Sequence, residues 1–215
     1  MSMLFVQRWD IAEGKVDEHT KFISEVHVPE STAMGFAPVG GYYVEAGEGP
    51  RIVAIYSVDD FDALGAIVTK KQFRRLTDTL RSMVCNYIRV VCEPTGRTKH
   101  EKYTIQKGVW KFNQYYDVRP GMREQYAEFV LHEHIPTVEK IDYVEITGGW
   151  NVVLGSGLEI VAEFTFKDSV DIGRLLSNED FRRVTSKLKN KFVTNYSSSI
   201  LRCTERFDDR KWLKF

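Results

Sequence analysis

The sequence predicts an α+β protein built from two successive halves, each with the element order β-α-β-β-α-β. Three observations carry this prediction. A strand-turn-helix stretch occurs twice at an offset of 107 positions, a glycine-rich hairpin follows each copy, and a helix and a strand end each half. A fixed offset held over several elements is typical of an internal repeat. With 215 residues, each half has roughly 100 residues, enough for a small domain.

The first repeated element is a strand. Residues 4–11 alternate, which places Phe5, Gln7, Trp9 and Ile11 on one face. The second copy keeps the same alternation, with Phe112, Gln114, Tyr116 and Val118 on the matching face. One polar side chain on an otherwise apolar face indicates that this face is turned towards a core or a pocket.

The second repeated element is a helix, which runs over residues 15–28 in the first copy. His19, Ile23 and His27 fall at steps of four, so they share one stripe of the helix. The matching positions of the second copy are Tyr126, Val130 and His134. We expect Pro29 and Pro136 to end these helices, because the residue before a proline disfavours helical geometry.

A hairpin, a helix and a last strand complete each half. Gly40-Gly41 matches Gly148-Gly149 at an offset of 108, and strands are expected on both sides of the glycine-rich turns that follow. The expected elements are Tyr42–Glu45, Ile52–Tyr56, Lys70–Met83 and Cys85–Cys92 in the first half, and Trp150–Leu154, Glu159–Phe166, Asn178–Phe192 and Val193–Arg202 in the second.

Each half therefore has the order of the ferredoxin-like unit, in which helices cover one face of a four-stranded sheet. Two such sheets can cover each other's bare faces, which predicts tandem ferredoxin-like halves that close an antiparallel barrel with helices outside. We predict a first repeat over residues 1–93, a polar linker over 94–108, a second repeat over 109–205 and a tail over 206–215. The apolar residues of the tail predict that it docks on the barrel; they are Trp212, Leu213 and Phe215.

Composition excludes several classes of partner. The chain has 30 basic and 30 acidic residues and no formal net charge, so it lacks the basic surplus typical of nucleic-acid-binding proteins and of polybasic membrane anchors. Its three cysteines are odd in number and form no CxxC pattern, which favours a reducing compartment. With neither a leader-like start nor a long apolar run, the sequence predicts a cytoplasmic protein.

A short motif resembles a known family. Residues 116–122, with the sequence YDVRPGM, are followed by a helix containing Phe129, and this stretch resembles the opening of NIPSNAP-type domains. More broadly, residues 4–93 and 109–207 are similar to the dimeric α+β barrel superfamily, which includes antibiotic-biosynthesis monooxygenases, EthD-like proteins and small polyketide cyclases. The resemblance implies a small apolar or aromatic ligand between the sheet and the helices of each half. It also implies a monomeric pseudo-dimer or a homo-oligomer of it.

His27 and His134 are the candidate catalytic residues. Each is expected near a helix C-terminus, where the helix dipole favours imidazolium, so that the side chain could titrate near neutral pH and move protons. The alternative is structural, with each imidazole bonding backbone carbonyls at the helix end.

The candidate ligand-binding residues come in pairs related by the repeat. Gln7 and Gln114 either hold a ligand oxygen or bond the neighbouring backbone. The other pairs are either pocket walls or ordinary core; they are Trp9 and Tyr116, Tyr42 and Trp150, and His19 and Tyr126.

Three hypotheses about function stay open. The first is a cofactor-independent monooxygenase, cyclase or isomerase that acts on a small aromatic or polyketide-like molecule. The second is a non-catalytic binding or scaffold protein. The third and weakest is a haem-binding protein with one histidine as axial ligand. We expect no metal site, because His132 and His134 are two residues apart and would point to opposite sides of a helix.

Overall fold

Eight antiparallel strands form one closed barrel in the computed structural model, which describes residues 2–96 and 109–204. The strand order around the barrel is β1-β3-β2-β8-β5-β7-β6-β4. The first half contributes β1 (Met3–Ile11), β2 (Ala37–Ala46), β3 (Ile52–Val58) and β4 (Val84–Pro94). The second contributes β5 (Trp110–Val118), β6 (Glu145–Gly155), β7 (Ile160–Phe166) and β8 (Val193–Cys203).

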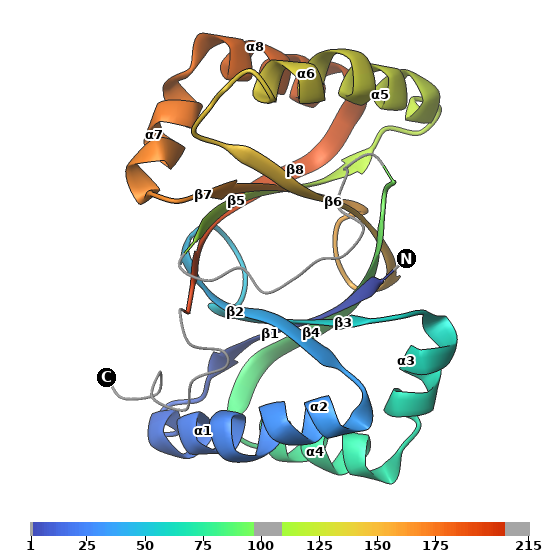
Figure 1. Cartoon of the computed structure of the whole chain (residues 1–215), viewed down its shortest axis with the longest axis vertical. Coiled ribbons are helices and arrows are strands. Elements are labelled where there is room, and N and C mark those ends of the chain that lie inside the picture. Colours follow the sequence, from blue (N-terminus) through green and yellow to red (C-terminus); the bar gives the residue numbers. More distant parts are fainter. Residues whose placement is uncertain (1, 97–108, 205–215) are drawn as a thin grey trace.

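The two halves are joined by hydrogen bonds between their outer strands. β2 pairs with β8, and β4 pairs with β6, so neither sheet has a free edge. Figure 1 shows the helices packed on the outer faces of the two sheets, at opposite ends of the molecule. The predicted α+β barrel with helices outside is confirmed. Most of the predicted linker and the whole predicted tail lie outside the described residues.

Helical segments fill both crossovers of each half. The first half has α1 (Val16–Phe22), the π-helical turn η1 (Ile23–His27), α2 (Val28–Met34), α3 (Phe61–Val68) and α4 (Lys71–Arg81). The second half has α5 (Arg123–Phe129), the π-helical turn η2 (Val130–His134), α6 (Ile135–Val138), α7 (Ser169–Ser177), α8 (Glu179–Lys187) and the π-helical turn η3 (Leu188–Phe192).

The expectation that Pro29 and Pro136 end their helices is wrong. The chain passes through η1 into α2, and the N–H of Val28 donates to the carbonyl of Ile23, five residues back. A proline lacks an N–H donor, and its ring crowds the carbonyl four residues earlier. A wider π turn just before the proline relieves this crowding, so the helical path continues. The second half has the same π turn, in which the N–H of Ile135 donates to the carbonyl of Val130 just before Pro136.

A hydrogen-bonded bulge recurs in both halves. Asp10 accepts from the backbone N–H of Arg51 at 2.7 Å and from the amide of Asn86 at 2.9 Å. Asn86 has a positive φ of 53°, and the pairing of β1 with β4 shifts register next to it. The second half has the same arrangement with Asp117, Glu159 and Asn195.

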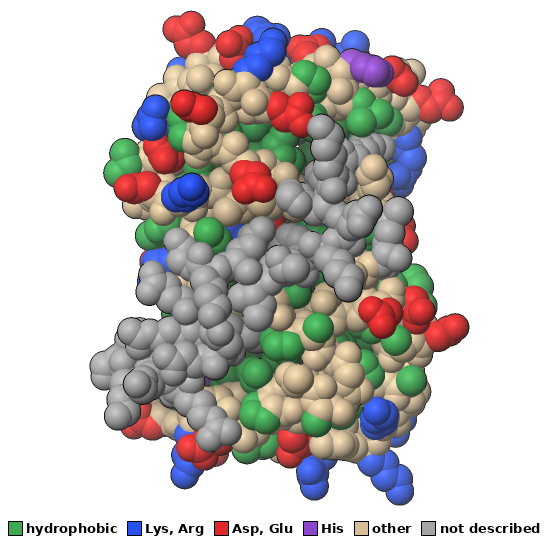
Figure 2. Space-filling model, in the orientation of Figure 1, with side chains coloured by type: hydrophobic (Ala, Val, Ile, Leu, Met, Phe, Trp, Pro, Cys, Tyr) green, Lys and Arg blue, Asp and Glu red, His purple; other side chains and the backbone are tan. Residues whose placement is uncertain are grey.

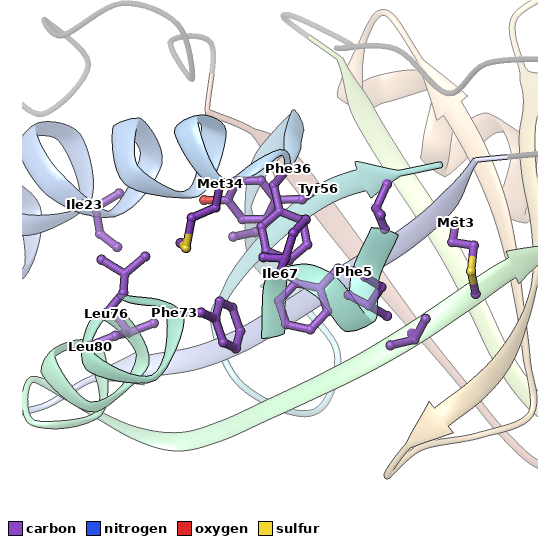
Figure 3. Packing of buried hydrophobic residues seen from close by; sticks show 14 of the residues in the cluster. Met3, Phe5, Ile23, Met34, Phe36, Tyr56, Ile67, Phe73, Leu76 and Leu80 are labelled. Carbon is purple, nitrogen blue, oxygen red and sulfur yellow. The ribbon is translucent and has the colours of Figure 1, made fainter. Parts of the chain in front are cut away.

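The core of the first half lies between its sheet and its helices. Aromatic and aliphatic side chains of β1, α2, α3 and α4 interlock there, and Phe5 stacks on Phe36 with 5.1 Å between the ring centroids (Figure 3). A comparable core fills the helix side of the second half. Burial of this apolar surface contributes roughly 25 cal/mol per Å² to folding.

A separate apolar cluster lies inside the barrel, where Tyr42 and Trp150 face the opposite sheet. Each ring follows a glycine on the same face of its strand. A Cβ at Gly40 would lie 2.8 Å from the Tyr42 ring, and one at Gly148 would overlap the Trp150 indole. These two glycines thus make room for the protein's own aromatic rings, and both sit at register shifts of the hairpins.

The surface carries charges of both signs. Figure 2 shows basic and acidic side chains interspersed over the helical layers of the face in view, in line with the balanced composition. No helix in residues 2–96 and 109–204 is long and apolar enough to cross a membrane. Cys92 and Cys203 are buried, and Cys85 is exposed.

Candidate functional site

The predicted site in the first half is a small cavity between the sheet and α1. It has a volume of about 60 Å³ and opens beside Val16 at the start of α1, a residue that is 53% exposed. Trp9, His19, His27 and Tyr56 line its interior together with the bare backbone at Gly41. Tyr42 also borders this cavity, so the structure brings together four of the residues that the sequence singled out.

Trp9 fixes the tautomer of His19. The indole Nε1–H donates to His19 Nε2 at 2.8 Å, and an indole nitrogen can only donate. His19 Nε2 is therefore the acceptor, and the neutral ring must carry its proton on Nδ1. This Nδ1 is buried and has no hydrogen-bond partner among the described residues. A buried donor without an acceptor is costly, and a ligand oxygen would satisfy it.

His27 lies next to this pair. Its Nδ1 is 3.1 Å from the hydroxyl of Tyr56, which is also hydrogen-bonded to Ser31. Only 2% of His27 is exposed. Because η1 continues into α2, His27 sits in the middle of a helical path, and the expected helix C-terminus with its dipole is absent at this position.

The buried histidines are neutral at physiological pH. Burial lowers the pKa of His19 to about 4. Burial, and secondarily the charge of His19, lower the pKa of His27 to about 4. Burial also lowers the pKa of His134 to about 4, against a weaker opposite effect of Glu133. The expectation that His27 and His134 titrate near neutral pH is therefore wrong, because desolvation of the cation dominates.

The second half has a different chemistry at the matching positions. Tyr116 and Tyr126 replace the Trp–His pair, and their hydroxyl oxygens are 3.0 Å apart. Phe164 stands where the first half has Tyr56, so His134 packs against an aromatic ring instead of a hydroxyl. The cavity here is about 40 Å³. The two half-sites are thus not equivalent, and the first is the more polar.

The two predicted glutamines are buried on the helix side of the sheet. Gln7 donates from Nε2 to the hydroxyl of Tyr87 at 2.6 Å, so its partner is a tyrosine of β4. Gln114 lies close enough to Tyr196 to influence that hydroxyl, although neither atom of its amide meets hydrogen-bond geometry. Burial raises the pKa of Tyr87 and of Tyr196.

Trp150 does not join the helix-side walls as expected, and Tyr42 borders both the helix-side cavity of the first half and the barrel interior. Their rings point into the barrel, while Trp9 and Tyr116 point towards the helices. The reason is strand pairing: Tyr42 lies opposite Val53, whose side chain also faces the interior. The predicted ligand-binding residues are therefore divided between two faces of the sheet.

The barrel interior holds a larger cavity that the sequence analysis did not predict. Its volume is about 310 Å³, at the lower end of the range of ordinary ligand sites. Lys111 and Glu163 form an ion pair of 2.6 Å in its wall, with side chains 1% and 3% exposed. Thr147 donates to Glu163 at 2.8 Å. Burial lowers the pKa of Lys111, and Glu163 acts against this shift.

Aligning the two copies of the repeat would have revealed the polar groups of this cavity. Lys111 matches Leu4, and Glu163 matches Ile55, at the same offsets that relate the helices and hairpins. Polar residues at positions that are apolar in the other copy indicate polar groups on the inner face of the second sheet. No group of three or more potential metal ligands among His, Cys, Asp and Glu occurs in residues 2–96 and 109–204.

The comparisons with known proteins concern the fold. No protein-family model matches the chain, and no curated protein matches it by sequence. A provisionally assigned monooxygenase from Lactobacillus acidophilus superposes with a TM-score of 0.63 at 12% identity, over 94% of this chain and 93% of that one. An anthrone oxidase-like protein gives 0.60 at 9% identity, over 94% and 90% of the two chains. The protein thus shares the α+β barrel fold of these structures.

A chlorite dismutase from Candidatus Nitrospira defluvii, in complex with imidazole, shares this α+β barrel fold. Its TM-score is 0.59 at 9% identity, over 99% of this chain and 95% of that one. A haem does not fit the helix-side site at His134. The cavity at His134 measures about 40 Å³, and Phe129, Phe164 and Phe181 surround the imidazole, so a porphyrin has no room there.

Proposed function

We propose that the first half binds a small molecule through an acceptor oxygen, which takes the hydrogen bond offered by His19 Nδ1. The observation that carries this proposal is the buried, partnerless Nδ1–H, whose position is dictated by Trp9. A carbonyl or phenolate oxygen supplies the missing acceptor. With about 60 Å³ of space, the cavity takes the reacting end of the ligand, and the rest of an apolar or aromatic body lies at the mouth beside Val16.

A neutral imidazole suits chemistry at a carbonyl. As a donor it polarises the C=O bond and stabilises the negative charge that develops on oxygen when a neighbouring C–H loses its proton. Proton loss of this kind begins cofactor-independent oxygenations, cyclisations and isomerisations. His19 then has the electrophilic role, while His27, hydrogen-bonded to Tyr56 in the same cavity wall, accepts the proton. The monooxygenase and anthrone oxidase-like proteins of the same fold support this reaction class by analogy alone.

Binding without turnover is the second candidate, and a specific observation favours it. With a pKa of about 4, His27 is a weak base at neutral pH, so proton abstraction there is slow. In this case the protein binds the same ligand through His19 but does not convert it.

One matched pair of probes tests the proposed site. Cyclohexanone and methylenecyclohexane have the same shape, but only the ketone offers an acceptor oxygen. We expect the ketone to bind about tenfold more tightly, the effect of one hydrogen bond to a buried donor. His19→Phe should remove this preference, whereas Tyr126→Phe, at the matching position of the second half, should keep it. Equal affinities in the unaltered protein would refute the proposal.

The same ketone separates the two candidates. An enzyme-like site accelerates exchange of the protons next to the carbonyl in D₂O, and His27→Phe slows that exchange. A protein that binds cyclohexanone with no acceleration over buffer is a binding protein.

A further inference from the structure

The barrel cavity has two chemically different walls. Side chains of the first half make one wall apolar, and these are Leu4, Val6, Val53, Ile55, Ile88 and Val90. The second half provides Lys111, Asn113, Glu163, Ser197 and Ser199 at positions related to these by the repeat. The second half also contributes apolar side chains, among them Val152, Val161 and Leu201, so its hydrogen-bonding groups lie within a partly apolar wall.

Arg8 is a charged residue within the apolar wall. Its guanidinium lies 5.8 Å from the ring centroid of Tyr115 across the cavity, and Nη2 donates to the carbonyl of Glu48 at 3.3 Å. Its Nε is buried and has no hydrogen-bond partner among the described residues, and no carboxylate there forms an ion pair with Arg8. The cavity therefore contains a half-buried cation with an unused donor.

The other charges of the cavity do not compensate Arg8. Lys111 and Glu163 neutralise each other within one ion pair. The only further charged residue that lines the described part of the cavity is Glu48, whose side chain is exposed on the hairpin between β2 and β3. The interior thus has an excess of positive charge at Arg8. A ligand anion at this point would gain charge-assisted hydrogen bonds in a poorly solvated site.

Unpaired polar atoms mark the opposite wall. The Oδ1 atom of Asn113 and the hydroxyl of Tyr42 are buried, and neither has a hydrogen-bond partner among the described residues. Asn113 Nδ2 lies 3.4 Å from the hydroxyl of Tyr115, the residue that faces Arg8. The unused donor and the unused acceptor are thus linked through one tyrosine. Buried polar atoms are normally satisfied, so unpaired atoms gathered around a cavity point to a ligand that pairs with them.

We propose that the barrel interior is a second ligand site, which takes a small organic acid whose carboxylate pairs with Arg8 and whose apolar body lies on the first-half wall. The volume of about 310 Å³ corresponds to roughly ten water molecules, enough for a body of about eight carbons. The histidine cavity lies on the other face of the sheet and shares Tyr42 and Val53 with this site, but none of its histidines.

Octanoate and octan-1-ol provide a matched test, because they share a chain and differ in charge. Titration into the full-length protein should give an affinity for octanoate at least tenfold higher than for octanol, since a charge-assisted hydrogen bond is stronger than a neutral one. Arg8→Met should abolish this preference. Arg89→Met is the control, because Arg89 lies on the neighbouring strand β4 with an exposed side chain outside this cavity.

Two further variants keep the test decisive. Ser197→Phe places a ring in the cavity, and it should weaken binding of both compounds at least tenfold while the thermal unfolding transition remains. If Arg8→Met fails to fold, Arg8→Gln takes its place and should likewise remove the preference for the acid. Equal affinities for acid and alcohol, or octanoate binding that persists in Ser197→Phe, would overturn the proposal. His19→Phe leaves octanoate binding unchanged, so failure here is distinguishable from failure of the helix-side site.

Discussion

The indole of Trp9 donates to Nε2 of His19 at 2.8 Å and thereby decides which nitrogen of a buried imidazole carries the proton. Since an indole has no acceptor nitrogen, the hydrogen bond can form in one direction only. The second half cannot repeat this arrangement, because two tyrosine hydroxyls meet there and either can donate. The polarity of the first half-site is therefore fixed by one residue, Trp9, on the strand that faces α1.

The first prediction concerns this tautomer. Nitrogen-15 NMR of the histidine side chains at pH 7 should show His19 neutral with its proton on Nδ1. Trp9→Phe removes the donor, so the ring should then populate both tautomers. Tyr116→Phe, at the matching position of the second half, should leave the His19 signals unchanged. A His19 ring protonated on Nε2 in the unaltered protein would contradict the assignment.

The second prediction is a loss of stability in acid. The pKa values of His19, His27 and His134 fall from 6.5 to about 4 on folding, so the unfolded chain binds more protons between these limits. Stability therefore decreases as the pH drops below about 6.5, and the loss is complete below about 4. Each histidine should account for roughly 2 kcal/mol between pH 7.5 and pH 5.

Urea unfolding at a series of pH values measures this effect. His134→Phe should reduce the pH dependence by about a third, because it removes one of three similar groups. His132→Gln is the control, since His132 is exposed on the surface of η2 and pairs with Glu128 at 3.2 Å. A free energy of unfolding that stays constant from pH 7.5 to pH 5 would show that the histidines are not buried as described.

The third prediction concerns the left-handed asparagines. Asn86 and Asn195 both have a φ of 53°, and each donates to the aspartate of the neighbouring bulge. Replacement by Ala adds backbone strain to the lost hydrogen bond, whereas replacement by Gly relieves the strain. We expect Asn86→Ala to destabilise the protein by about 1 kcal/mol more than Asn86→Gly does. The same difference should appear at Asn195, and a difference near zero at both would exclude strain there.

The side of the sheet to which a side chain points could be predicted where one face of the strand was clearly apolar. It could not be predicted elsewhere. The Phe5–Ile11 alternation was enough to place Trp9 on the helix side. Tyr42 and Tyr43 gave no such guidance, because both faces of this sheet are covered and neither side is systematically polar. Only the pairing of Tyr42 with Val53 decides that Tyr42 faces the interior.

The protonation state of His27 could not be predicted from the sequence for a related reason. The position of His27 before Pro29 indicated a helix end, but the π turn at Ile23–His27 carries the helix onward. The low pKa of His27 then follows from complete burial, which depends on side chains from β1, β3 and α1 that are distant in sequence. A repeat in the sequence can show that a histidine recurs, but not how much water reaches it.

The last prediction concerns the buried ion pair of the barrel. Lys111 and Glu163 are nearly inaccessible, and their desolvation offsets much of their attraction. Lys111→Leu alone leaves the Glu163 carboxylate buried without its cation, so we expect a loss of about 3–5 kcal/mol. The double variant Lys111→Leu/Glu163→Ile installs the residues that the first half has at the matching positions, Leu4 and Ile55.

The double variant should be about as stable as the original protein, or up to about 4 kcal/mol more stable, because it removes both desolvated charges and extends the apolar wall across the cavity. Thr147 keeps a partner in Thr165, 2.7 Å away, so no new unpaired hydroxyl results. Urea unfolding of the two single variants and the double variant gives the coupling energy directly. The double variant could instead lose as much free energy of unfolding as the two single variants lose together. Lys111 and Glu163 would then stabilise the protein through separate contacts, and these polar side chains would be required for folding.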